Sequence, residues 1–408
     1  ELVPSTGNTL IGLTNENDNG NKLENIVIYN NHFHHCGEGR TQPVKGDVTA
    51  IGIGQNVENV WIVDNLIHHI GGDGIQPYIA NLTENTIFPN HIYIGRNVFH
   101  DNFENAVDLK QCQDVIISQN IAYNFGEEYS DVGGGSPFRY GTDATGRKNI
   151  WTIFNEVYNS SSPDGAFLSY SGDGVQPFAD EIYYIGNIVH DCHNSSGTAA
   201  AFGCWNQQHI YFANNIAYDC DSGGGFWITN NDNPNECLTL INNIFAESGS
   251  SIRGYLVIGT KTQGPSDFDN LTMSNDLFYQ NSGLGKLSFY EWYEPRQRLE
   301  YIEYTIDEFK EAKPDKAQGT FEANPNFVDA INGDFHLQSN SPAIDAGTVH
   351  HYFDRFYNLY GIEIRVDFNG NPIPQGLAPD IGAYEYRSED KIKPGDTLPD
   401  KTELTCYN

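Results

Sequence analysis

A small set of polar residues in the middle of the chain could bind an anion and move a proton. Asp108 and Lys110 stand in the triplet Asp-Leu-Lys, and Arg139 follows in Phe-Arg-Tyr-Gly. Tyr170 lies further on, in Leu-Ser-Tyr. The planar guanidinium of arginine binds a carboxylate through two parallel hydrogen bonds. A lysine whose pKa is lowered by a nearby cation can act as a general base, and a tyrosine can protonate a leaving oxygen. These residue types therefore predict proton abstraction next to a carboxylate.

A pair of carboxylates offers a second kind of chemistry. Asp73 in Gly-Gly-Asp-Gly and Asp108 could serve as general acid and general base for hydrolysis, and Asp143 and Asp173 are further candidates. Inverting glycosidases hold two such groups about 6.5–9.5 Å apart. Asp73 and Asp108 are also the candidate ligands for a Ca²⁺ ion, although Asp-Gly is equally a common turn sequence.

The elements that position these residues are copies of one short repeat. In each copy, apolar residues alternate with others, and an Asn at the seventh position precedes two apolar residues and an aromatic. The seventh position reads Asn31, Asn65, Asn97, Asn120, Asn155, Asn187, Asn215, Asn243 and Asp276. Copies spaced 23 to 35 residues apart, with little helix signal, predict a parallel β-helix whose coils stack about 4.8 Å apart. We expect Asn at the turn because it tolerates left-handed angles and its side chains can bond from coil to coil.

A second strand in each coil carries the candidate site on its outward face. An inward aromatic ladder aligns the copies through Phe138, Phe167, Phe202, Phe226 and Tyr255. The outward residues of these strands share one face of one sheet and are Gln76, Tyr78, Asp108, Lys110, Arg139, Tyr170, Trp205 and Trp227. The predicted substrate-binding members of this set are Gln76, Tyr78, Trp205 and Trp227. In this register Arg139 lies beside Asp108, so a plain surface salt bridge worth ~0–1 kcal/mol is the competing interpretation.

Two other outward rows must be distinguished from this face. One row is aromatic and consists of Trp61, Tyr93, Trp151, Tyr183 and Tyr211. We expect the C-terminal tail to cover this row, because the other face contains the charged residues. The second row holds either His or Tyr, at His34, His68, His100, His190, Tyr123, Tyr158, Tyr218 and Tyr279. This alternation predicts a stack of packed rings and not a catalytic site.

The composition restricts the possible partners. The 408 residues carry a formal net charge of −32, so nucleic acid and acidic membrane surfaces are poor partners. No apolar run reaches the ~18 residues of a membrane span. The seven scattered Cys indicate no disulfide framework. Cys192 and Cys220 share a repeat position and are expected to be stacked thiols, with one bridge between them as the alternative.

The repeats place a β-helix at 1–284 and an extension at 285–408. Thr305 begins a capping box, so 305–312 is predicted to form a short helix. The segment 324–386 is expected to close the C-terminal end or to pack along one side. The first 20 residues are too short to cap the coils, so we expect a capping portion to precede them. A start at Glu1 without Met fits a processed, secreted product.

With these features the chain resembles the right-handed parallel β-helix proteins of the pectate-lyase-like superfamily. The repeats between Asn25 and Asn281 carry the resemblance, and the motifs NPNF, GDFHL, SPAIDAG and DIGAYEY resemble a C-terminal segment of secreted bacterial members. The resemblance implies an all-β, single-stranded right-handed parallel β-helix of about nine or ten coils, in a secreted or periplasmic protein. Members include lyases, hydrolases, epimerases and phage tailspikes, so the fold does not select the reaction.

Within the superfamily, the sequences around Lys110 and Arg139 are similar to those of alginate and chondroitin lyases. There a Lys acts as base and an Arg on the next coil assists. The resemblance implies β-elimination in a uronate-containing polysaccharide, with Lys110 as base, Arg139 neutralising the carboxylate and Tyr170 as acid. Of the acidic metal ligands upstream of the Lys in those lyases, only Asp108 is present here. The alternatives are a glycoside hydrolase that uses Asp73 and Asp108, and a non-catalytic, tailspike-like polysaccharide-binding protein.

Overall fold

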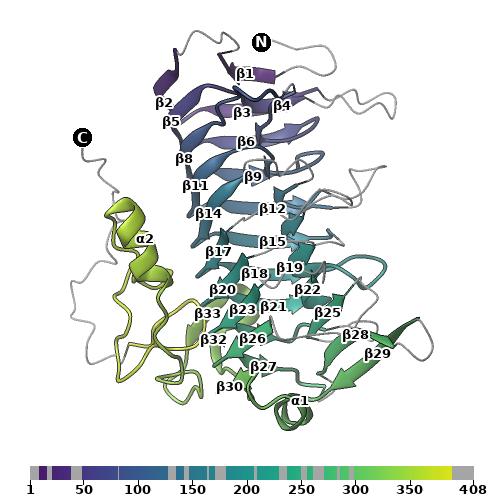
Figure 1. Ribbon diagram of the computed structural model, residues 1–408. Helices are drawn as coiled ribbons and strands as arrows, with labels where there is room; N and C mark the ends of the chain where they lie inside the picture. The colour runs from purple at the N-terminus through teal and green to yellow at the C-terminus, as the bar shows by residue number, and fades with distance from the viewer. Residues whose placement is uncertain are drawn as a thin grey trace.

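Three parallel sheets stack coil upon coil into a single column (Figure 1). The computed structural model describes residues 9–15, 21–37, 48–80, 82–126, 135–141, 147–162, 165–170, 181–205, 209–228, 237–249, 255–260, 271–282, 285–293 and 298–387. Successive strands of the chain enter three different sheets in turn, named here sheets A, B and C, which contain eleven, ten and ten strands. This architecture confirms the predicted all-β parallel β-helix.

The strands of each sheet follow one another in chain order. Sheet A contains β1 (Thr9–Leu13), β4 (Thr49–Ile53), β7 (Ile75–Pro77), β10 (Val107–Leu109), β13 (Phe138–Tyr140), β16 (Phe167–Tyr170), β19 (Ala200–Trp205), β22 (Ser222–Ile228), β25 (Leu256–Thr260), β28 (Leu287–Tyr293) and the antiparallel β29 (Arg298–Tyr304). Sheet B contains β2 (Leu23–Tyr29), β5 (Val57–Val63), β8 (Asn90–Gly95), β11 (Gln113–Ser118), β14 (Lys148–Ile153), β17 (Glu181–Ile185), β20 (His209–Ala213), β23 (Cys237–Ile241), β26 (Leu271–Ser274) and β30 (Ala317–Gln318). Sheet C contains β3 (His32–Cys36), β6 (Leu66–Ile70), β9 (Val98–His100), β12 (Ile121–Phe125), β15 (Glu156–Ser160), β18 (Ile188–Cys192), β21 (Ile216–Cys220), β24 (Ile244–Ala246), β27 (Leu277–Tyr279) and β31 (Phe321–Glu322).

The alternation of side chains decides which residues fill the column. In β11, Val115 and Ile117 are fully buried, and they lie in register with Ile92 and Ile94 of β8. Because equivalent positions stack from coil to coil, branched aliphatic residues form continuous inward rows. Each outward position therefore also lies beside its equivalent on the next coil, which is the property that can assemble a site from distant residues.

A buried asparagine ladder joins sheets B and C along the column. The Oδ1 atom of Asn155 accepts hydrogen bonds from the backbone N and from the Nδ2 of Asn120, both at 2.9 Å. Asn155 donates in turn to Asn187 Oδ1 at 3.0 Å and to the Ile117 carbonyl at 3.0 Å. The expectation that the ladder Asn itself adopts the left-handed backbone angle is wrong. Positive φ occurs at the residue just before the ladder Asn, and this residue can be as different as Arg96 and Phe154. The ladder Asn is required for its side-chain bonds instead.

The last rung of the ladder is a carboxyl group, and we predict that it makes stability depend on pH. Burial raises the pKa of Asp276 to about 7, although the amides of Asn243 donate to it. Because the pKa of Asp276 is higher in the folded state, this group contributes stability that is fully present below its unfolded-state pKa near 3.8. The contribution is lost as the pH rises through about 7. Asp276→Asn should therefore raise the unfolding free energy by on the order of 1–4 kcal/mol at pH 8. At pH 4 the two proteins should have similar unfolding free energies in urea titrations, and an equal difference at both pH values would contradict the assignment.

The inward aromatic ladder of sheet A is shorter than predicted. Phe138, Phe167 and Phe202 stack, with ring centroids 4.9 and 5.7 Å apart. Phe226 does not continue this stack, because β22 begins early and places Gly224 opposite Phe202. Tyr255 precedes β25 and packs against another coil instead. The same shift brings Trp227 opposite Trp205, whereas the predicted alignment of Phe226 with Phe202 places Trp227 opposite Gly203.

The β-helix extends past the predicted boundary at residue 284. Strands β28, β30 and β31 add in parallel to sheets A, B and C, so the last coil ends near Glu322. The predicted short helix is α1 (Ile306–Ala312), and Thr305 caps it in the expected capping box. The helix lies at the C-terminal end of the column (Figure 1). None of the helices in the described part of the chain is both long and apolar enough to cross a membrane.

The rest of the described extension packs along the side of the column, which is the second of the two placements that the sequence left open. It contains β32 (Phe327–Asp329), a 3-10 turn (Ala330–Asn332), β33 (Asp334–Leu337) and α2 (Tyr352–Tyr360). Helix α2 lies beside sheet B (Figure 1), and its Tyr352 and Phe356 pack on the outward aromatic row. As a result Trp151 and Tyr183 are almost completely buried. The expectation that the tail covers this row is confirmed for its central residues.

The His and Tyr positions of sheet C form a stack of rings. Neighbouring rings from His34 through His68, His100, Tyr123 and Tyr158 to His190 are nearly parallel, with centroids 4.4 to 5.6 Å apart. Burial and the neighbouring histidines lower the pKa of His68 to about 4. The cysteines at the other shared position, Cys192 and Cys220, are buried free thiols in register, as expected.

Candidate functional site

The candidate site lies on the outer face of sheet A, where two rows of side chains run along the column. Asp108 and Arg139 are register partners in the first row, and Gln76 of the preceding coil contacts Asp108. The second row contains Tyr78, Lys110 and Tyr170, each directly after or at the end of a strand of this sheet. Each strand is only three or four residues long here, so the chain leaves the sheet immediately after these side chains.

Asp73 and Asp108 form a pair of buried carboxyl groups. The Nε2 of Gln76 lies 2.5 Å from Asp73 Oδ2 and 3.5 Å from Asp108 Oδ2, so one amide reaches both. Asn105 donates its backbone and side-chain N–H groups to Asp73 Oδ1 at 3.2 and 2.7 Å. Burial raises the pKa of Asp73 well above its usual range, and the charges of Asp108 and Glu104 raise it further. Asp73 is therefore a carboxyl group suited to hold a proton near neutral pH.

Asp108 has one oxygen without a hydrogen-bond partner among the described residues. Its Oδ1 is buried and, within the described residues, accepts no hydrogen bond. A side chain at Gly141 would crowd this oxygen, since a Cβ there would stand 2.9 Å from it. Glycine at position 141 thus avoids a close contact with Asp108 Oδ1, and this role was not predicted.

Lys110 is held between a carboxylate and an aromatic ring. Its Nζ lies 3.5 Å from Asp108 Oδ2 and 5.0 Å from the centroid of the Tyr78 ring. Burial lowers the pKa of Lys110, but Asp108 and Asp73 outweigh that effect and the net direction is upward. The expectation that a nearby cation lowers this pKa is wrong, because the groups that act on Lys110 are carboxylates. Lys110 is consequently charged at neutral pH.

Arg139 does not form the predicted salt bridge with Asp108. Although the two residues are in register, the carboxylate pairs with Lys110, and the guanidinium lies over the Tyr170 ring, 5.4 Å from its centroid. The reason is that both cations compete for one carboxylate, and the lysine on the same strand reaches it. Arg139 is half-buried, and among the described residues no carboxylate pairs with its guanidinium, which is the group that can bind an anion through two hydrogen bonds.

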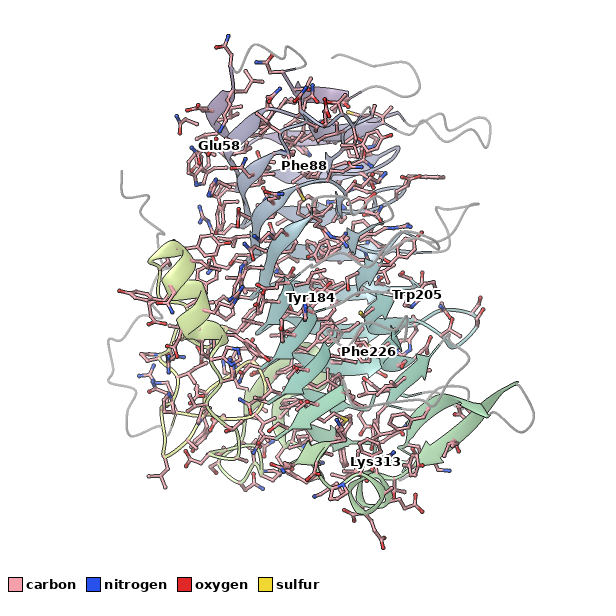
Figure 2. The ribbon with its side chains drawn as sticks, viewed as in Figure 1. Glu58, Phe88, Tyr184, Trp205, Phe226 and Lys313 are labelled. Atoms are coloured by element: carbon pink, nitrogen blue, oxygen red, sulfur yellow. The ribbon has the colours of Figure 1, made fainter. Side chains whose placement is uncertain are left out.

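Aromatic side chains flank the charged residues on both sides. Tyr78 is 42% exposed, and on the other side Tyr170 and Trp205 meet edge to face with centroids 6.1 Å apart. Figure 2 shows Trp205 on the outer side of the column and Tyr184 in its interior. Trp227 follows Trp205 in register, but its side chain lies outside the described residues, as do Asp143 and Asp173. Exposed rings in a row suit the apolar faces of sugars.

The calcium assignment gains no support from this geometry. In the described ranges, no third carboxylate joins Asp73 and Asp108 at a spacing suited to a metal ion. Lys110 instead supplies the positive charge next to the pair. Calcium ions in proteins take six to eight oxygen ligands, which two carboxylates and one amide do not provide.

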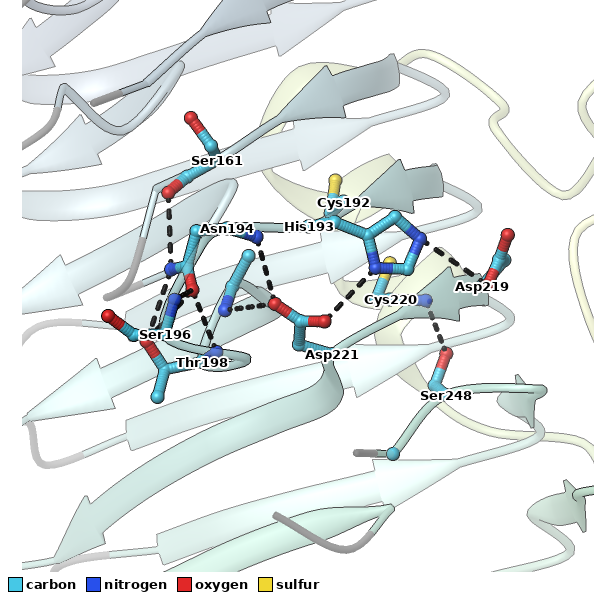
Figure 3. A network of polar contacts seen from close by, with 12 residues as sticks. Ser161, Cys192, His193, Asn194, Ser196, Thr198, Asp219, Cys220, Asp221 and Ser248 are labelled. Carbon is cyan, nitrogen blue, oxygen red and sulfur yellow. Dashed lines mark hydrogen bonds and ion pairs between the residues drawn. The ribbon is translucent and has the colours of Figure 1, made fainter. Parts of the chain in front are cut away.

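A further charged cluster, which the sequence did not reveal, joins sheets C and A in Figure 3. The imidazole of His193 contacts Asp221 at 3.0 Å and Asp219 at 3.4 Å. Hydrogen bonding to Asp219 and Asp221 raises the pKa of His193 to about 9, against a smaller effect of burial. Asp221 Oδ2 also accepts from the backbone N of Asn194 and of Ala199, so the cluster fastens the turn before β19. Both carboxylate oxygens of Asp221 are occupied by these contacts, so the cluster has a structural role.

The structure thus brings Asp73, Gln76, Asp108 and Lys110 into one contact network, with Arg139, Tyr170, Tyr78 and Trp205 along the same face. Asn105 and Gly141 belong to this site and were not predicted. Their signal in the sequence was weak, because Asn and Gly are frequent in the turns throughout this chain. Comparison of this chain with protein-family models and with curated proteins gave no match.

Proposed function

We propose that the chain is an enzyme that cleaves an acidic, uronate-containing polysaccharide by β-elimination. The observation that supports the proposal is the placement of Lys110 and Arg139, both partly exposed, on adjacent coils next to Tyr78 and Tyr170. The protein carries a net charge of −32, so an anionic polymer requires local positive charge of this kind. We also propose a secreted or periplasmic location, where such polymers occur.

In this mechanism each side chain has a separate task. Arg139, whose guanidinium is not paired with Asp108, binds and neutralises the uronate carboxylate and so acidifies the C5 proton. Neutral Lys110 removes that proton, and Tyr170 gives a proton to the departing glycosidic oxygen. Asp108 orients Lys110 through their contact. Gln76, Tyr78, Trp205 and Trp227 bind the neighbouring sugars.

A glycoside hydrolase is the second candidate, and a specific observation favours it. Asp73 has a raised pKa, and Asp108 lies close enough for one amide to contact both carboxyl groups. Two carboxyl groups whose environments differ can divide the roles of general acid and general base or nucleophile. In this mechanism, Asp73 protonates the leaving oxygen, and Asp108 acts through Oδ1, which accepts no hydrogen bond within the described residues.

One digestion experiment separates these functions. The protein is incubated with alginate, pectate, glycosaminoglycans and neutral glucans, with and without chelator. Elimination leaves an unsaturated uronate that absorbs in the ultraviolet, whereas hydrolysis gives new reducing ends without that absorbance. We expect ultraviolet absorbance with at least one uronate polymer. Reducing ends alone would establish hydrolysis, and binding without new ends would establish the tailspike-like alternative.

The pH dependence provides an independent prediction. A lysine with a raised pKa must lose its proton to act as base, so kcat/KM of the lyase should rise about tenfold per pH unit between neutral pH and the pKa of Lys110. Asp73 in a hydrolase must keep its proton, so kcat/KM should instead fall above the raised pKa of that residue. A rate that decreases from pH 7 to pH 9 in buffers of equal ionic strength would exclude the lysine mechanism.

A further inference from the structure

Six of the thirteen histidines gather on the first three strands of sheet C. They are His32, His34, His35, His68, His69 and His100. The ring stack described above accounts for His34, His68 and His100 only. The remaining three occupy different positions, so ring packing alone does not explain why this end of the column is rich in imidazoles.

Two of the remaining histidines, His35 and His69, occupy the turn position near the end of their strands. His35 and His69 both have left-handed backbone angles, and their rings stack with centroids 4.7 Å apart. The equivalent residues of the later coils are Asp101, Asn124, Asn159, Asp191, Asp219 and Glu247, which adopt the same angles. Asn, Asp and His all suit this conformation, so the backbone angle permits His in the first two coils but does not require it.

The ring nitrogens face one another at short distances. His68 Nδ1 lies 2.7 Å from His69 Nδ1, and His68 Nε2 lies 2.7 Å from His32 Nε2. One ligand atom each of His68, His69 and His100 lies within 4.8 Å of the others. Two imidazole nitrogens bound to one Zn²⁺ through bonds of ~2.0–2.1 Å would stand about 3.3 Å apart, so small ring rotations suffice.

The surroundings resemble the outer shell of a metal site. His100 Nδ1 lies 2.6 Å from Asp101 Oδ2, and Asn124 donates to the other oxygen of that carboxylate at 3.4 Å. An Nδ1–H that donates to a carboxylate fixes the ring and leaves the Nε2 lone pair for a metal ion. His68, His69 and His100 are partly exposed, which gives an ion access from solvent.

We propose that His68, His69 and His100 bind a transition-metal ion of the Zn²⁺ class. Imidazole nitrogens suit Zn²⁺, Cu²⁺ and Ni²⁺, whereas Ca²⁺ and Mg²⁺ prefer oxygen. The ligands come from β6 and β9, so the ion clips adjacent coils near the N-terminal end of the column. The site lies on sheet C, separate from the polysaccharide site on sheet A, and does not depend on the proposed enzymatic function.

Calorimetric titration of the untagged, chelator-treated chain with Zn²⁺ tests this site, with Ca²⁺ as the comparison ion. Two variants remove a ligand and keep the local structure. His69→Asn introduces the residue type of Asn124 and Asn159, and His68→Tyr introduces the ring found at Tyr123 and Tyr158. The control is His91→Asn, an exposed left-handed position outside the cluster, equivalent to Asn59 and Asn149.

We expect the wild-type chain to bind one equivalent of Zn²⁺ and no Ca²⁺ at this site. Each ligand variant should bind Zn²⁺ at least ~10-fold more weakly, and His91→Asn should bind like the wild type. Bound Co²⁺ should show a visible spectrum typical of imidazole ligands in the wild type and in His91→Asn, but not in the two ligand variants. The proposal would be overturned if the wild type did not bind one equivalent of Zn²⁺. It would also be overturned if both ligand variants bound Zn²⁺ as tightly as the wild type.

Discussion

Replacing Lys110 with Ala should lower kcat/KM on the cleaved uronate polymer by about 10²–10⁴-fold, because general-base catalysis typically contributes that much. The variant should also lose the rise of rate with pH that the wild type shows. The assay is the initial rate of ultraviolet absorbance, measured at several pH values. Because the variant leaves the buried Asp108 carboxylate without its cation, we expect the thermal unfolding midpoint to fall as well, so rates are compared at a temperature where circular dichroism shows both proteins folded.

Two controls distinguish a base from a structural cation. Lys110→Arg keeps the positive charge beside Asp108 but does not deprotonate at accessible pH, so it should be nearly as inactive as the Ala variant. Lys148→Ala removes an exposed lysine from sheet B and should leave the rate unchanged. If Lys110→Arg restores activity, or Lys110→Ala costs less than ~10-fold, the lysine only holds the carboxylates in place.

Replacing Asn155 with Ala should destabilise the protein by ~2–4 kcal/mol. The substitution removes the acceptor for two N–H groups of Asn120 and the donor to the Ile117 carbonyl. These groups are buried in the middle of the column, where water cannot replace the lost partner, so each carries a desolvation cost. Equilibrium urea unfolding followed by circular dichroism measures the change.

Asn31→Ala provides the matched control, because Asn31 occupies the equivalent ladder position in the first coil. Asn31 is exposed and donates to Asn65, whose Oδ1 still accepts from the backbone N of residue 31. Its removal should cost less than ~1 kcal/mol. Similar losses in both variants would show that the ladder contributes through turn geometry and not through buried hydrogen bonds.

The sequence predicted the column because its pattern is local and repeated. A fixed Asn and a two-residue alternation specify, coil by coil, which side chains point inward and which share an outer face. For the same reason the register of Asp108 with Arg139 could be predicted correctly. The misplaced Phe226 shows the limit of this approach, since an early strand start shifts the alignment without changing the repeat.

Charges and contacts at the site depended on the tertiary structure. A long side chain can reach partners on its own coil and on two neighbouring coils. The alternating pattern of the strands therefore could not predict that Lys110 pairs with Asp108 and not with another group. The direction of the Lys110 and Asp73 pKa shifts likewise follows from burial and from charges that stacking brings together. The clustering of His68, His69 and His100 has the same origin. Local alternation thus determined the column and its faces, while stacking of coils decided which polar groups meet, because that depends on distances the repeat does not encode.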